Sequence, residues 1–249
     1  MKGFKSFRIP NSRGNSRGTS DRESPNNIIE ISPTGDVILA VGEGDQQKRL
    51  RVESAVLCHS SKVFAAMSSP PWVESEGLGS AAPKEIRLPE DSFEAMKAIC
   101  YIVHSQNSLV PVSMTAQKFL NVVLHVDKYD LGRALQATRE SWWRRFLNIV
   151  DGLSEVDLIH LIAAAHLLKE DTMFPKLTIC LVVRNTSTDT YTDFMEDPFL
   201  ADLLPAKLFG MYFTICVPKP KVLEVLGSMP ISCIYDVGPI KANQVGDSL

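Results

Sequence analysis

The order of two hydrophobic periodicities along the chain constrains its fold more than any other feature. Apolar residues follow the period of two that is typical of β-strands only in short segments within residues 37–52 and 86–88. Beyond residue 93, the recognisable apolar segments repeat at the spacing of helices. Short strands followed by a run of helices are typical of an α+β domain rather than of a doubly wound parallel sheet. The predicted fold class is therefore α+β.

A strand hairpin is predicted to begin the folded part of the chain. Residues 37–41 are apolar at every position, so this strand is expected to be covered on both faces. Residues 42–45, Gly-Glu-Gly-Asp, have turn chemistry, and Leu50 and Val52 mark the returning strand. The elements expected next are short helices at residues 55–58 and 61–67 and a short strand containing Ile86 and Leu88.

The rest of the recognisable pattern is helical. Asp91 and Glu94 resemble a capping box and predict the start of a helix whose apolar stripe continues to Val103. Residues 115–129 are apolar on most sides, which predicts a central, buried helix. Further helical segments are expected from Leu131 to Ile149, from Ser154 and Asp157 to about Lys169, from Asp171 or Thr172 with Pro175 in the first turn, and within residues 199–217.

The two ends of the chain lack such periodicity. Residues 1–27 contain few large apolar side chains, and their burial could not offset an ordering entropy of roughly 1–2 kcal/mol per residue. The predicted organisation is a disordered basic leader at 1–27, one domain at 28–138, a helical C-terminal extension at 139–217 and an irregular tail at 218–249.

Charge is unevenly placed along the chain. Residues 1–27 contain six basic and two acidic side chains, a net of +4; since the whole chain has a net charge of −3, the remainder carries −7. This balance argues against a protein that binds nucleic acid over its whole surface. The basic leader leaves open a contact with an acidic surface or a role in nuclear import, beside the simpler interpretation as a solvated tail.

Cysteine usage and hydropathy bear on the compartment. The five cysteines are odd in number and scattered, with no Cys-x-x-Cys pair, which indicates a reduced, intracellular protein. The N-terminus has no apolar run that would make a secretory signal, and the longest charge-free apolar run, Leu158 to Leu168, is far shorter than the ~20 residues of a membrane span. A soluble protein of the nucleus or cytoplasm is expected.

Four sequence blocks together resemble the BTB/POZ domain, most closely the form common in filamentous fungi. They are Gly35 to Val41, Arg51 to Phe64, Glu85 to Asp91 and Asp127 to Asp130, and they lie within about residues 28–138. The resemblance implies a small β-sheet with a helical shell, followed by additional helices. Motif residues of the family correspond to Asp36, Ser61, Phe64, Asp127, Lys128, Tyr129 and Asp130. Glu53 stands where many animal members have a histidine.

The resemblance also implies protein partners. Members of the family dimerise and act as adaptors, many of them by binding a cullin scaffold of a ubiquitin ligase through a hydrophobic-x-Glu triplet. Eight residues beyond Phe64, the triplet Trp72, Val73 and Glu74 fits that pattern and is the candidate cullin contact. The alternative is that Trp72 only covers the edge of the core. The later stripe of Trp142, Phe146 and Ile149 could likewise bind a partner helix or pack within the core.

No residue set predicts catalysis, and no catalytic, cofactor-binding or metal-binding residue is assigned. Cys100 and His104 have the i, i+4 spacing of metal ligands, but no second pair accompanies them. Cys58 and His59 are adjacent and point in different directions on a helix. Residues 142–145, Trp-Trp-Arg-Arg, favour a buried Trp142 and a solvated arginine face over a nucleic-acid surface. The expected function is a non-enzymatic interaction module; the alternative is a nuclear regulator whose leader contacts nucleic acid.

Overall fold

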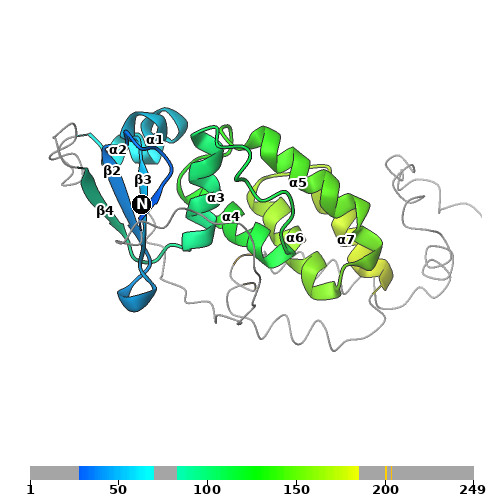
Figure 1. Cartoon of the computed structure of the whole chain (residues 1–249). Coiled ribbons are helices and arrows are strands. Elements are labelled where there is room, and N and C mark those ends of the chain that lie inside the picture. The colour runs from blue at the N-terminus through cyan, green and yellow to red at the C-terminus, as the bar shows by residue number, and fades with distance from the viewer. Residues whose placement is uncertain (1–27, 70–82, 185–199, 201–202, 204–249) are drawn as a thin grey trace, which may run out of the picture. The chain divides into compact units, whose positions relative to one another are not determined.

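The computed structural model describes residues 28–69, 83–184, 200 and 203, and divides the chain into two compact units, 1–148 and 149–249 (Figure 1). Among its described residues the first unit contains a β-sheet, five α-helices and the short 3-10 helix η1 (Gly44–Gln46), and the second contains two α-helices and one short 3-10 helix. The predicted leader at 1–27 and tail at 218–249 lie outside the described residues.

A four-stranded mixed sheet begins the first unit. Strands β1 (Ile28–Glu30), β2 (Val37–Val41), β3 (Lys48–Val52) and β4 (Lys84–Leu88) lie in the order β1-β3-β2-β4. β2 and β3 form the predicted antiparallel hairpin, whereas β1 pairs with β3 and β4 pairs with β2 in parallel. Gly42 has a φ of 88° in the hairpin turn, a conformation that side chains with a Cβ rarely adopt. The hairpin and the strand at 86–88 are confirmed, and β1 was not predicted.

The two faces of the sheet differ in chemistry. Val37, Leu39 and Leu50 are buried on the inner face, as the alternation predicts. On the outer face Ala40 is buried but Ile38 is only half-buried. The prediction that both faces of residues 37–41 are covered is therefore only partly right. Charged side chains of the neighbouring strands occupy the outer face and form the ion pairs Arg49–Glu85 at 3.2 Å and Arg51–Glu30 at 3.5 Å.

Helices α1 (Ser54–Ser60), α2 (Lys62–Met67), α3 (Phe93–Val103) and α4 (Ala116–Lys128) follow the strands, and α3 and α4 lie side by side (Figure 1). α3 contacts β3 and α1, and it buries Met96, Ile99 and Cys100, as its stripe predicts. The predicted capping residue is wrong. Ser92, not Asp91, caps α3, and its hydroxyl accepts a hydrogen bond from the amide of Ala95.

The core of the first unit continues through α4 into α5 (Gln136–Asn148). Phe119 of α4 is fully buried, and its ring lies 4.9 to 5.9 Å from the rings of Trp142, Trp143 and Phe146 in α5. This aromatic cluster confirms the prediction of a central, buried helix at 115–129 and favours core packing for the stripe in α5. Ile149, predicted on the same stripe, is 55% exposed because it lies beyond the end of the helix.

In the second unit, η3 (Val150–Gly152) precedes α6 (Glu155–Leu167) and α7 (Met173–Arg184). Ser154 and Asp157 form a complete capping box at the start of α6, as predicted. α6 and α7 pack on each other, and Pro175 lies in the first turn of α7. Of the helix predicted within residues 199–217, only residues 200 and 203 are described. The domain limits at residues 138 and 217 stay predictions.

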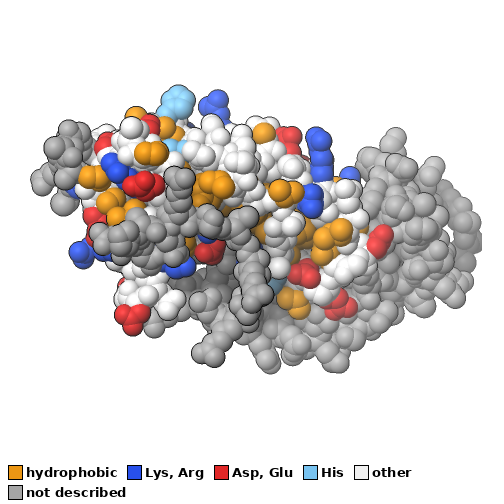
Figure 2. Space-filling view, viewed as in Figure 1, with side chains coloured by type: hydrophobic (Ala, Val, Ile, Leu, Met, Phe, Trp, Pro, Cys, Tyr) orange, Lys and Arg blue, Asp and Glu red, His pale blue; other side chains and the backbone are white. Residues whose placement is uncertain are grey.

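No helix within the described part of the chain is long and apolar enough to cross a membrane. On the face shown in Figure 2, acidic, basic and apolar side chains of the described residues are interspersed rather than gathered by kind.

Candidate functional site

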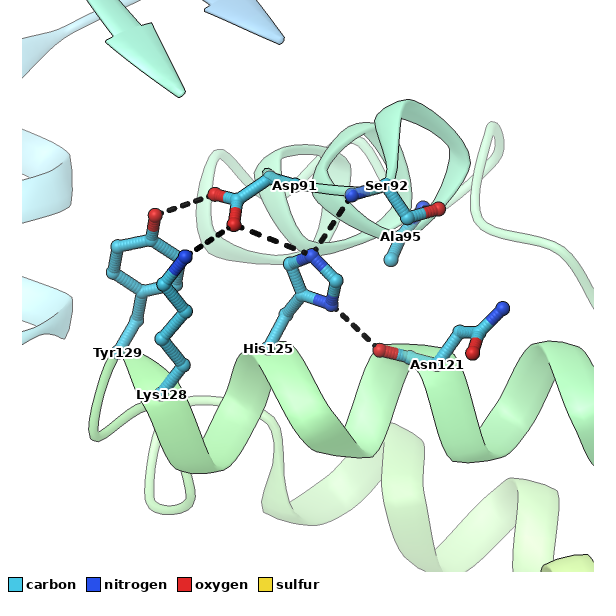
Figure 3. Close-up of polar contacts among 7 residues, drawn as sticks. All are labelled: Asp91, Ser92, Ala95, Asn121, His125, Lys128 and Tyr129. Carbon is cyan, nitrogen blue, oxygen red and sulfur yellow. Dashed lines mark hydrogen bonds and ion pairs between the residues drawn. The ribbon is translucent and has the colours of Figure 1, made fainter. Parts of the chain in front are cut away.

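A group of polar side chains surrounds the buried Asp91, in the turn between β4 and α3 (Figure 3). The Asp91 side chain is only 1% exposed. Its carboxylate accepts a hydrogen bond of 2.5 Å from the Tyr129 hydroxyl and one of 2.6 Å from Nζ of Lys128. Lys128 and Tyr129 stand at the end of α4. The group therefore joins the turn before α3 to the C-terminal end of α4, and its lysine compensates the buried negative charge.

His125, one turn before the end of α4, completes this group. Its Nδ1 lies 2.7 Å from the carbonyl oxygen of Asn121, so Nδ1 carries the proton, and its Nε2 accepts a 3.0 Å hydrogen bond from the amide of Ser92. Burial lowers the pKa of His125 below its usual value; the nearby Asp91 carboxylate opposes this shift without cancelling it, and Lys128 reinforces it. His125 is therefore a neutral imidazole that accepts a backbone hydrogen bond at the start of α3.

These interactions leave the group poorly suited to acid–base catalysis. Nε2 of His125 is 3.7 Å from Asp91, but the amide of Ser92 already uses its lone pair. Burial and the neighbouring Asp91 charge raise the pKa of Tyr129, so the phenol stays protonated and serves as a donor. Among the described residues, no three His, Cys, Asp or Glu side chains gather as a metal site would require. The arrangement holds two helices in place.

A second histidine, His104 at the C-terminal cap of α3, makes the same kind of contact. Its Nδ1 lies 2.9 Å from the carbonyl oxygen of Cys100, and its Nε2 accepts a 3.1 Å hydrogen bond from the amide of Glu53, the residue at the N-cap position of α1. Burial raises the pKa of the Cys100 thiol to about 12. Of this i, i+4 pair, Cys100 is therefore buried in the core, and both imidazole nitrogens of His104 are engaged with backbone groups.

Glu53 belongs to a small polar network beside His104. Its carboxylate accepts hydrogen bonds from the hydroxyls of Ser32 at 2.5 Å and Thr34 at 2.9 Å, and these bonds lower the pKa of Glu53. Ser32, Glu53, His104 and Gln106 line a hollow of about 280 Å³. The network fixes the segment between β1 and β2 against the start of α1.

Other motif residues from the sequence also serve the fold. Asp36 accepts hydrogen bonds from the amide and the hydroxyl of Ser54, at 2.8 and 2.7 Å, at the start of α1. Burial raises the pKa of Asp36, but the hydrogen bonds from Ser54 outweigh burial and hold that pKa below its usual value. The Ser61 hydroxyl donates to the carbonyl oxygen of Tyr129 and accepts from the amide of Phe64.

The ring of Phe64 stacks on that of Tyr129, with centroids 4.6 Å apart. Segments that are distant in the sequence therefore meet at Tyr129: the start of α2 through Ser61 and Phe64, and the start of α3 through Asp91. Each of these motif residues is explained by a contact within the first unit.

The predicted partner contact at Trp72, Val73 and Glu74 lies outside the described residues. In α5, Trp142 and Trp143 are buried while Arg144 and Arg145 are exposed. That orientation is the one predicted for Trp142, and it leaves neither tryptophan ring of α5 on the surface for a nucleic-acid base to stack on.

Sequence reasoning missed an exposed apolar loop between α3 and α4. Leu109 is 49% and Val112 is 69% exposed, although the loop is held in place by hydrogen bonds. The amide of Gln106 donates to Tyr101, and Nε1 of Trp142 donates to the carbonyl oxygen of Pro111 at 2.9 Å. Beside the loop lies a hollow of about 430 Å³, whose lining includes Ala95, Ala98, Pro111, Met114, Lys118 and Val122.

The only signal of this loop in the sequence is its run of apolar residues, Leu109, Val110 and Val112, outside any strand or helix periodicity. An ordered loop that exposes large apolar side chains is a common feature of interaction surfaces. Leu109 and Val112 are exposed although hydrogen bonds order the loop that carries them.

Residues 31–142 match the family model of the BTB/POZ domain. This range covers strands β2 to β4, helices α1 to α4 and the first half of α5, and β1 lies just before it. The mixed sheet with its helices agrees with that fold. No curated protein matches the sequence.

Proposed function

We propose, from the premise that residues 31–142 form a BTB/POZ domain and hence a protein-interaction domain, that the chain is a non-enzymatic module that homodimerises or acts as an adaptor. The observation that carries the proposal is the ordered apolar loop. Leu109 and Val112 face solvent, while the motif residues around Asp91 and Tyr129 are occupied within the fold. A closer kinship with the filamentous-fungal form stays a prediction.

Burial of the two exposed side chains would favour association. Removing apolar surface from water contributes about 25 cal/mol per Å², and the loop loses little conformational entropy on binding because hydrogen bonds already order it. The neighbouring hollow of about 430 Å³ offers space for a partner side chain. These features support a partner contact at the loop.

The double variant Leu109→Ser/Val112→Ser tests this contact. The full chain is studied by sedimentation velocity, alone and with a purified cullin N-terminal domain, and the variant is expected to weaken whichever association the wild type shows. The matched control is Val156→Ser/Ile179→Ser, which removes two exposed apolar side chains from the second unit. Equal association of the loop variant and the wild type would remove the loop from the proposal.

The adaptor form of the proposal assigns the cullin contact to Trp72, Val73 and Glu74. It rests on the resemblance and on the spacing from Phe64, since this triplet lies outside the described residues. In a pull-down with the cullin N-terminal domain, Trp72→Ala/Glu74→Ala is expected to lose most binding, because truncation of an interface tryptophan typically costs about 2 kcal/mol or more. Asp45→Ala, an exposed carboxylate in the hairpin turn, is the control. Undiminished binding would remove this assignment.

A second candidate function is a nuclear regulator that dimerises through the domain and contacts nucleic acid through residues 1–27. The net charge of +4 on this segment, against −7 on the remainder, favours it. It predicts DNA binding that weakens steeply with salt and disappears when residues 1–27 are deleted. Absence of DNA binding at low salt would exclude this candidate.

A further inference from the structure

Two histidines of the first unit have the same hydrogen-bonding arrangement. In each, Nδ1 lies within hydrogen-bond distance of the carbonyl oxygen four residues earlier in the same chain segment, Cys100 for His104 and Asn121 for His125. In each, Nε2 accepts a hydrogen bond from the amide of the residue that caps another helix, Glu53 before α1 or Ser92 before α3. Each histidine thus connects the end of one helix to the beginning of another.

Only a neutral imidazole can make this pair of contacts. A protonated ring carries hydrogen on both nitrogens, so its Nε2–H would face the amide N–H of Glu53 or Ser92, donor against donor. The N-terminal end of the α1 or α3 dipole disfavours the cation, whereas the C-terminal end of the histidine's own helix, α3 for His104 and α4 for His125, favours it, so the two dipoles oppose each other. Protonation therefore breaks the hydrogen bond and sets donor against donor at the same place.

The charged groups around the two histidines differ. His104 faces the Glu53 carboxylate, which favours its protonation, and Asp36 lies near Glu53 in turn. His125 faces Asp91, which favours protonation, and Lys128 of its own helix, which opposes it. The hydroxyl of Tyr129 contacts the same Asp91 carboxylate and stays neutral. Burial outweighs the two carboxylates, so the pKa of His104 and that of His125 lie below the usual value.

We propose that His104 and His125 each form an acid-sensitive contact between two helices. Protonation of His104 releases the N-terminal turn of α1, and protonation of His125 releases that of α3. This acid sensitivity goes beyond a partner-binding role, because it controls how firmly the helices of the domain are held. α1 contacts both α2 and α3, so release of its first turn loosens the part of the helical shell next to the sheet.

The direction of the pH dependence follows from the lowered pKa values. The unfolded chain binds more protons than the folded one in mild acid, so stability is fully present above about pH 6.5, the ordinary histidine pKa. Stability falls as the pH decreases from there through the folded-state pKa values of the two rings. When both histidines take up a proton on unfolding, the equilibrium constant for unfolding rises by up to about 100-fold for each unit by which the pH falls. When only one of them does, the rise is up to about tenfold.

Urea unfolding of the full chain between about pH 7.5 and pH 5, above the ordinary range of carboxylates, measures this dependence. His104→Gln and His125→Gln each place an uncharged amide oxygen near the position of Nε2. Each is expected to lower by about one the number of protons taken up on unfolding, which is the slope of the unfolding free energy against pH. The double variant is expected to be nearly flat across this range. His59→Gln, at an exposed histidine of α1, is the control and is expected to keep the wild-type slope.

A second readout needs no variant. In the wild-type chain, the ring protons of His104 and His125 are expected to titrate in NMR spectra below the ordinary histidine pKa of about 6.5. The amides of Glu53 and Ser92 are expected to lose protection against hydrogen exchange over the same range. Titration of both rings at or above about pH 6.5, with no loss of amide protection, would overturn the proposal, as would slopes unchanged in both single variants.

Discussion

The hydroxyl of Tyr129 lies 2.5 Å from the carboxylate of Asp91, although the two residues are 38 positions apart in the chain. The same tyrosine accepts a hydrogen bond from Ser61 at its carbonyl oxygen and stacks its ring on Phe64. Tyr129 therefore joins the starts of α2 and α3 to the end of α4. Ser61, Phe64 and Asp91 are occupied in building this junction, whereas Leu109 and Val112 in the loop between α3 and α4 are exposed.

Tyr129→Phe is expected to destabilise the chain by about 2 kcal/mol, because a buried carboxylate loses a hydrogen bond that water cannot replace. The free energy of unfolding, measured by urea titration at neutral pH, gives the loss directly. Asp45→Asn, at an exposed carboxylate of the hairpin turn, is expected to change it by less than about 0.5 kcal/mol. An equally small effect of Tyr129→Phe would mean that the Asp91 contact contributes little.

Ser61→Ala removes both the cap of α2 and the hydrogen bond to Tyr129. Since Ser61 is buried, the expected loss is about 1–3 kcal/mol, more than for a solvent-exposed cap alone. Ser141→Ala, at an exposed position of α5, is the matched serine control. Similar unfolding midpoints for the two variants would contradict the role given to Ser61.

The capping of α1 by Asp36 predicts a separate dependence on acid. Because the pKa of Asp36 is lowered in the folded state, its contribution is present above the ordinary aspartate pKa of about 3.9. The contribution is lost as the pH falls from there through the folded-state pKa. Asp36→Asn is expected to reduce stability at neutral pH and to flatten its decline below about pH 4. If the stability of Asp36→Asn falls with pH as steeply as that of the wild type, a group other than Asp36 causes this acid dependence.

The two tryptophans of α5 allow a matched test of what orders the exposed loop between α3 and α4. Nε1 of Trp142 donates to Pro111, whereas Nε1 of Trp143 is buried without a hydrogen-bond partner among the described residues. Trp142→Phe is therefore expected to increase hydrogen exchange in residues 105–115 and to weaken partner binding. Trp143→Phe is expected to leave the exchange of that loop unchanged. Equal exchange in the two variants would show that the indole hydrogen bond does not order the loop.

Contacts between near neighbours in sequence were predictable. The capping box of Ser154 and Asp157 needs only four consecutive residues, and the hairpin of β2 and β3 follows from alternation and a turn. The buried face of α4 likewise follows from its composition, because a helix that is apolar on most sides must be covered.

The errors arose where a distant residue decides the outcome. Asp91 and Ser92 are both good capping residues, and Tyr129 and Lys128 occupy the Asp91 carboxylate, so Ser92 caps α3 instead. β1 has only three residues, too few to show a period, and it is defined by pairing with β3 about 20 positions later. The same limit applies to His104 and His125, whose partners at Glu53 and Ser92 come from other elements.

Sedimentation velocity of the full chain, alone and with a cullin N-terminal domain, tests most directly the claim that this is an interaction module whose exposed loop contacts its partner. We expect a species heavier than one chain in at least one of these samples, and its loss in Leu109→Ser/Val112→Ser but not in Val156→Ser/Ile179→Ser. A chain that sediments as a monomer in both samples, or a loop variant that associates as the wild type does, would contradict the account.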